Sequence, residues 1–99
     1  MNFIRSDVGD EAKLRIAGPL DALTVPDLRP VLDSLVADGV ARVTVDLREV
    51  PLIDSSAVGA LVSLYKRIKA QGGAMLVVGA QEQPMAVFRL LKLEKVFGL

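Results

Sequence analysis

Apolar segments with the period of a strand and apolar segments with the period of a helix alternate along this chain. Read from the amino terminus, their order is strand, strand, helix, strand, helix, strand, helix. Strands that are separated by a helix pair in parallel through right-handed crossovers, whereas two strands joined by a short turn pair antiparallel. The pattern predicts an α/β fold, close to α+β: a small mixed sheet of four strands packed with about three helices.

The predicted strands differ in how much of each is buried. Residues 3–8 predict an edge strand, and residues 12–18 alternate apolar and charged side chains, as a half-buried strand does. A turn at residues 9–11 joins these two strands into an antiparallel hairpin. Residues 42–47 predict the next strand. Residues 74–79 are nearly all apolar, which predicts a strand that is covered on both faces.

The first predicted helix has a candidate N-cap residue and a proline in its interior. Thr24 is expected to cap its amino terminus, with Asp27 three positions later in a pattern close to a capping box. Pro30 lacks the N–H that the helix ladder needs, so the helix is expected to kink there or to begin later than Thr24 suggests. It is expected to end near residues 38–39.

The clearest helix covers residues 55–70, and Gly72 and Gly73 are expected to end it. Its apolar face is predicted to contain Val58, Leu61, Tyr65 and Ile68. Pro84 is expected to begin a last short helix. The inward side chains of that helix are predicted to be Met85, Phe88 and Leu91.

Composition excludes several classes of protein. The 99 residues predict one domain, residues 1–99, and only 4% of them are aromatic, so its core must be aliphatic. Twelve basic and twelve acidic residues give a net charge of zero, which argues against a nucleic-acid partner and a basic membrane patch. The longest apolar runs are too short to span a bilayer, and acidic residues stand where a signal peptide needs an apolar stretch. We therefore expect a cytoplasmic protein without direct membrane insertion.

The chain has neither Cys nor His. This excludes disulfides, thiolate chemistry, zinc sites built from these residues and any catalytic triad that needs an imidazole. No cofactor and no metal ion are expected.

The strand at residues 42–47 leads into the helix at residues 55–70 through Asp54, Ser55 and Ser56. One interpretation is that Asp54 or Ser55 only caps the helix, because these residue types are strongly favoured as caps. The other is that a hydroxyl at the first turn of a helix accepts a phosphate, which would add a charge of about −2 beside Asp54 and alter whatever docks there. Asp21, which follows the neighbouring strand, is expected on the same edge of the sheet. The residues fit both interpretations equally well.

Two motifs resemble those of STAS domains, the family of bacterial anti-sigma factor antagonists. The segment from Gly18 to Thr24 (GPLDALT) matches the family pattern Gly-x-Leu-Asp-x-x-Thr. The segment from Ile53 to Gly59 (IDSSAVG) matches the pattern around the family's Asp-Ser-Ser turn, with Ala57 where Gly is commoner. The resemblance extends over essentially the whole chain.

The resemblance implies a partner-switching function. Such antagonists bind an anti-sigma factor that is a serine kinase of the GHKL type, are released when it phosphorylates them, and are reset by a serine phosphatase. By position the acceptor is Ser55. The other residues carried over as partner-binding or supporting are Asp21, Thr24, Asp54, Ser56, Val58 and Gly59. The surface around Ser55, Val58 and Val62 is expected to be exposed and apolar, as a docking face is.

Two other functions are alternatives to the switch. Some members of this family are structural subunits of larger assemblies, such as phospholipid-trafficking ABC transporters, and are never phosphorylated. An enzyme with Ser55 as nucleophile is disfavoured, because no His is present to act as its base and Lys66 lies about three helical turns away. We therefore expect a binding protein and not an enzyme, with ATP and Mg²⁺ belonging to the kinase.

Overall fold

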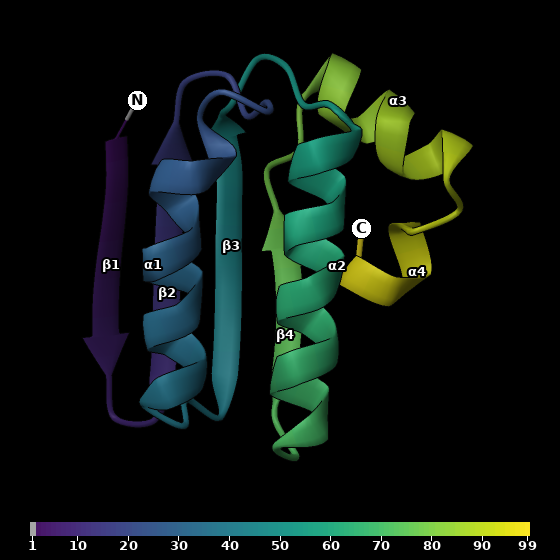
Figure 1. Ribbon diagram of the computed structural model, residues 1–99. Helices are drawn as coiled ribbons and strands as arrows, with labels where there is room; N and C mark the ends of the chain where they lie inside the picture. The colour runs from purple at the N-terminus through teal and green to yellow at the C-terminus, as the bar shows by residue number, and fades with distance from the viewer. Residues whose placement is uncertain (1) are drawn as a thin grey trace.

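The computed structural model describes residues 2–99 and contains one four-stranded sheet (Figure 1). The elements in chain order are β1 (Asn2–Val8), β2 (Glu11–Ala17), α1 (Val25–Ala37), β3 (Arg42–Glu49), α2 (Ser55–Ala70), β4 (Ala74–Val78), α3 (Glu82–Leu90) and α4 (Glu94–Phe97). The strand order is β1-β2-β3-β4, with β1 antiparallel to β2 and the other pairs parallel. The predicted mixed sheet is confirmed, and α4 is a helix that the sequence pattern did not predict.

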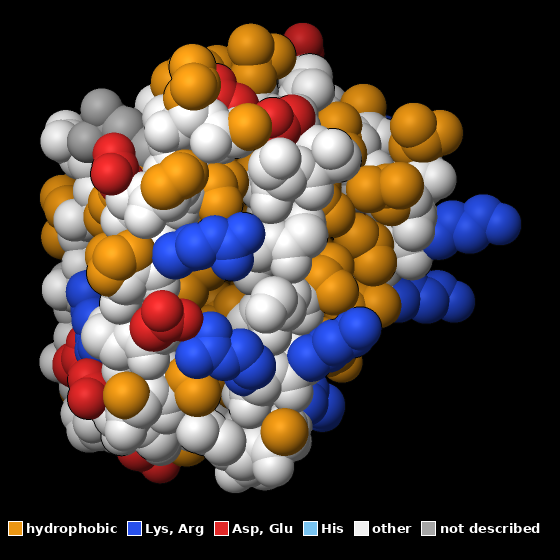
Figure 2. Space-filling view, viewed as in Figure 1, with side chains coloured by type: hydrophobic (Ala, Val, Ile, Leu, Met, Phe, Trp, Pro, Cys, Tyr) orange, Lys and Arg blue, Asp and Glu red, His pale blue; other side chains and the backbone are white. Residues whose placement is uncertain are grey.

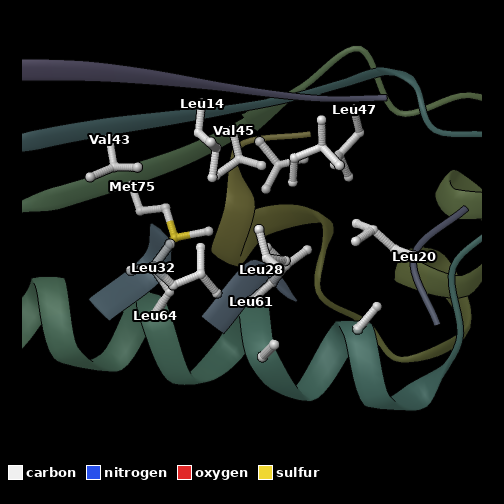
Figure 3. Close-up of a cluster of buried hydrophobic side chains, with 14 of the residues drawn as sticks. Leu14, Leu20, Leu28, Leu32, Val43, Val45, Leu47, Leu61, Leu64 and Met75 are labelled. Atoms are coloured by element: carbon white, nitrogen blue, oxygen red, sulfur yellow. The ribbon is translucent and has the colours of Figure 1, made fainter. Parts of the chain in front are cut away.

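The core lies between the sheet and one layer of helices. In Figure 1, α1 and α2 lie side by side over the same face of the sheet. The parallel register places Leu14 opposite Val45 and Val45 opposite Val77, and all three are buried. Figure 3 shows such strand side chains facing leucines of the two helices, including Leu28, Leu32, Leu61 and Leu64. As expected for a chain with few aromatic residues, this core is aliphatic.

The opposite face of the sheet is open, and here one expectation is wrong. Alternate residues of β4 are buried and accessible, and Leu76 is 51% exposed, so this strand is not covered on both faces. The helices α1 and α2 lie over the other face (Figure 1), and charged side chains of β2 and β3 share this one, such as Lys13 near Asp46 (Nζ–Oδ2, 3.6 Å). An apolar sequence run cannot by itself distinguish full burial from burial on one face.

The amino terminus of α1 also differs from the prediction. Thr24 precedes the helix but makes no side-chain capping bond. Its Oγ1 instead accepts a hydrogen bond from the Asp21 N–H (2.9 Å) and donates to the Pro19 carbonyl (3.1 Å). The helix starts at Val25 and continues through Pro30. The bond that Pro30 cannot make would go to the carbonyl of Pro26, and both prolines are exposed, so water can reach that carbonyl.

Aromatic side chains hold the carboxyl-terminal segment against the core. Phe88 of α3 and Phe97 of α4 are fully buried and meet edge to face, with ring centroids 5.5 Å apart. Phe97 makes a second such contact with Tyr65 of α2, at 5.9 Å. Phe88 faces inward as predicted, whereas Leu91 is 48% exposed because α3 ends at Leu90. Among residues 2–99, no helix has the length and apolar character needed to cross a membrane.

Candidate functional site

Two loops meet at the carboxyl edge of the sheet. The segment after β2 and the segment after β3 pair there through a parallel bridge between Leu20 and Ile53. The Leu20 N–H donates to the Leu52 carbonyl (2.9 Å), and the Asp54 N–H donates to the Leu20 carbonyl (3.1 Å). This pairing places Asp21 and Asp54 on one edge, as the sequence predicted. The edge lies at the top of Figure 1, where α2 begins.

The Asp54 carboxylate connects the two loops. One oxygen, Oδ1, accepts from the Ala57 N–H (3.0 Å) and caps α2, which confirms the predicted cap. The other, Oδ2, accepts from the Ala22 N–H (3.0 Å), 32 residues away in sequence. Both oxygens are therefore used to position backbone.

The Asp21 carboxylate organises its own turn. Its Oδ1 accepts from the backbone N–H groups of Leu23 (3.0 Å) and Thr24 (3.1 Å). Thr24 closes the same turn through its hydroxyl, as described above. Asp21 and Thr24 thus hold the loop that lies beside Asp54, and neither of them begins the helix.

Ser55 and Ser56 are the first two residues of α2, and both are exposed. Backbone N–H groups in the first turn of a helix lack intrahelical partners, and the helix dipole makes this end favourable for negative charge. The Ser55 hydroxyl therefore combines access from solvent, the partial positive charge of the helix amino terminus and a neighbouring carboxylate on Asp54. Such a position suits a group whose charge is to change.

Of the remaining residues expected to bind a partner or to support the site, some are buried in the core and some are exposed. Val58 is only 6% exposed, which confirms its place on the apolar face of the helix and makes its expected exposure beside Ser55 and Val62 wrong; Val62 is half-buried. Ala57 is fully buried, so its methyl group faces the core and not a partner. Gly59 is exposed, and a Cβ built on it would meet nothing within 4 Å.

The exposed apolar side chains at this edge belong to the loops. Leu23 is 88% exposed and Leu52 is 53% exposed. Figure 2 shows hydrophobic and acidic side chains together at this end of the molecule. Neither leucine was among the site residues predicted from the sequence. Each is a large apolar residue in a loop, outside the helix and strand periodicities, and this was the available indication.

The Asp54 carboxylate is the acidic group nearest to Ser55 in sequence. Each of its oxygens accepts one backbone N–H bond, so the structure shows it positioning the two loops. Within residues 2–99, no group of three acidic side chains is placed to hold a metal ion.

The mixed sheet, its single helical layer and the Asp-Ser-Ser turn at the carboxyl edge together match one class of small domain. The sequence model of the STAS domain matches residues 4–99, and the chain belongs to this family. It is 28% identical over 90 residues to the anti-sigma-B factor antagonist of Bacillus subtilis, covering 91% of this chain and 82% of the relative.

Solved structures agree with this assignment. A putative anti-sigma factor antagonist from Thermotoga maritima superposes with a TM-score of 0.88 at 25% identity, covering 95% of this chain and 81% of that chain. The phosphorylated form of the Bacillus cell fate determinant SpoIIAA shares the fold, with a TM-score of 0.77 at 20% identity over 95% of this chain and 86% of that chain.

Proposed function

We propose that this chain is an anti-sigma factor antagonist whose binding is switched by phosphorylation of Ser55. The observation that carries the proposal is the place of Ser55: an exposed hydroxyl at the first position of α2, next to the capping carboxylate of Asp54. The antagonists named among its relatives supply the class of partner, an anti-sigma factor. In the unphosphorylated state the chain binds that factor and removes it from its sigma factor.

The charge change explains why phosphorylation would release the partner. A phosphate on Ser55 adds about −2 charge within one residue of Asp54. The helix terminus offsets part of the repulsion inside the domain, so the domain stays folded. A partner docked on Leu23 and Leu52 would instead have to bury this charge beside its apolar contact, which is costly. The switch therefore acts on the interface more than on the fold.

The proposed cycle needs two other proteins. The anti-sigma factor is a serine kinase of the GHKL type, and it supplies the ATP and Mg²⁺ that phosphoryl transfer requires. A serine phosphatase returns the antagonist to its binding form. The chain itself is not an enzyme in this cycle, and all three proteins meet in the cytoplasm.

A capture experiment tests the proposal. The wild type, Ser55→Ala, Ser55→Asp and Ser63→Asp are immobilised, and bound proteins from the native cytoplasm are identified by mass spectrometry. Ser63→Asp is the matched control, because Ser63 is an exposed serine further along the same helix. We expect a GHKL-type ATPase on all forms except Ser55→Asp, whose affinity should fall by roughly a hundredfold or more.

Phosphorylation is then measured with the captured ATPase, ATP and Mg²⁺, and the modified residue is mapped. Modification at Ser55 and none in Ser55→Ala supports the proposal; modification at Ser56 alone contradicts the assignment of the acceptor. If all four forms retain the same transporter or scaffold proteins, Ser55 is only part of a helix terminus. The chain is then a structural subunit, for example of a phospholipid-trafficking ABC transporter.

A further inference from the structure

The side chain of Gln83, in the first turn of α3, binds the backbone of the loop that precedes Ser55. Its Oε1 accepts a hydrogen bond from the Ile53 N–H (2.9 Å), and its Nε2 donates to the Ile53 carbonyl (3.0 Å). The two bonds together fix the orientation of the carboxamide, because the reversed orientation would satisfy neither. The contact joins residues 30 apart in sequence and is partly buried.

Ile53 is thereby held from two sides. In an extended segment the peptide groups of successive residues point to opposite sides. The peptide groups of Leu52 and Asp54 that point to one side bond to Leu20, as described above. The N–H and carbonyl of Ile53 itself point to the other side, where the carboxamide of Gln83 takes the position that a further strand would occupy.

The residue after Ile53 is the capping Asp54, and Ser55 follows. A shift of the loop would therefore move the cap, the start of α2 and the hydroxyl together. We propose that Gln83 is a positioning residue of this switch: its carboxamide holds residues 52–54 in the register that presents Ser55, and so connects α3 to the phosphorylation site. The inference deepens the function proposed above and rests on it for its kinetic part.

Two substitutions separate positioning from simple packing. Gln83→Leu keeps the approximate volume and removes both hydrogen bonds. Gln83→Glu is nearly isosteric: its ionised carboxylate accepts from the Ile53 N–H but repels the Ile53 carbonyl, whereas its protonated form can make both bonds. The control is Gln81→Leu, since Gln81 is an exposed glutamine of the same segment whose side chain bonds to the nearby Gly79 carbonyl (3.2 Å).

Hydrogen exchange followed by NMR gives the first measurement, as protection relative to the wild type at the same pH. We expect Gln83→Leu to reduce protection of the Asp54 and Ala57 amides by roughly tenfold, because these amides report the register and the cap. Gln83→Glu should show the same loss above about pH 6 and recover it below about pH 4, where glutamic acid is protonated. Gln81→Leu should match the wild type at both amides.

Kinetics with the kinase isolated by the capture experiment give the second measurement. In Gln83→Leu, kcat for phosphoryl transfer to Ser55 should fall by roughly tenfold to a hundredfold, because the hydroxyl is misplaced. KM should rise by less than kcat falls, because only Leu52 of the two docking leucines lies in the loop that Gln83 holds, whereas Leu23 lies in a turn that is held by Asp21.

The inference is overturned if Gln83→Leu alters exchange at Ile53 alone, if Gln83→Glu shows no recovery in acid, or if kcat equals that of Gln81→Leu. If no kinase is isolated, the proposed function fails, and the exchange measurements still decide whether Gln83 positions the loop.

Discussion

Replacing Asp54 by Ala should destabilise the domain more than expected for a half-buried loop residue. The substitution removes two hydrogen bonds made by one carboxylate, to the N–H groups of Ala57 and Ala22. Loss of a helix cap costs about 1 kcal/mol, and loss of a bond from an exposed N–H costs a further ~0.5–1 kcal/mol, since water replaces it in part. The expected total is about 1.5–2 kcal/mol.

Urea unfolding followed by circular dichroism measures this loss. With a slope of roughly 2 kcal/mol per molar urea, the midpoint should fall by about 1 M. Asp27→Ala is the matched control, because Asp27 lies in the first turn of α1 but makes no capping bond there. That control removes only an interaction with the helix dipole and should cost about 0.5 kcal/mol.

Asp54→Asn extends the test to the individual bonds. Its remaining carbonyl oxygen can keep the cap on Ala57, while its NH₂ group faces the Ala22 N–H and cannot accept from it. An intermediate loss of about 1 kcal/mol is expected. If Asp54→Ala costs no more than Asp27→Ala, the carboxylate acts only through its charge, and the argument that it connects the two loops fails.

Three further predictions concern residues away from the site. Lys92 has φ +58°, so Lys92→Gly should stabilise the domain by roughly 0.5–1 kcal/mol in urea unfolding, whereas Lys92→Ala should be neutral; equal effects of the two would point to charge instead. Phe97→Ala should cost about 3–5 kcal/mol by the same assay, because the ring is fully buried, and a loss below about 1 kcal/mol would contradict its role in anchoring α4. Hydrogen bonds from Arg5 hold the pKa of the Asp7 carboxyl below its ordinary value. The stability that the Arg5–Asp7 pair contributes is present above the pKa of Asp7 in the unfolded chain, and it is lost as pH falls through the pKa of Asp7 in the folded chain. By NMR titration, Arg5→Met should return the pKa of Asp7 to its ordinary value, and an unchanged titration would refute the pairing.

Local sequence patterns predicted the elements whose ends are set by nearby residues. The bounds of α2 agree with the prediction because Asp54 caps one end and Gly72, at φ +80°, follows the other. The common edge of Asp21 and Asp54 followed from the rule that functional groups gather where parallel strands end. Helix ends can be predicted from short segments, and the shared edge of the sheet can be predicted from the order of the elements.

What the sequence did not predict depends on contacts between distant segments. Thr24 has the residue type of a cap, yet its hydroxyl is used by the turn around Asp21. Val58 was predicted both on the apolar face of its helix and at an exposed docking surface, and the packing of α2 on the sheet decides for burial. The bonds from Gln83 to Ile53 have no counterpart in the local sequence pattern of either segment.

The pairing of Leu20 with Ile53 has a consequence for when the site can form. The contact closes a loop of 33 residues, at an entropic cost of about 3 kcal/mol, so it must wait until β2 and β3 have associated. The β1–β2 hairpin needs only local contacts and can form much earlier during synthesis. A nascent chain that has not reached residue 83 also lacks one of the two supports of Ile53. A protein that recognises this edge would therefore discriminate a completed domain from one still emerging from the ribosome.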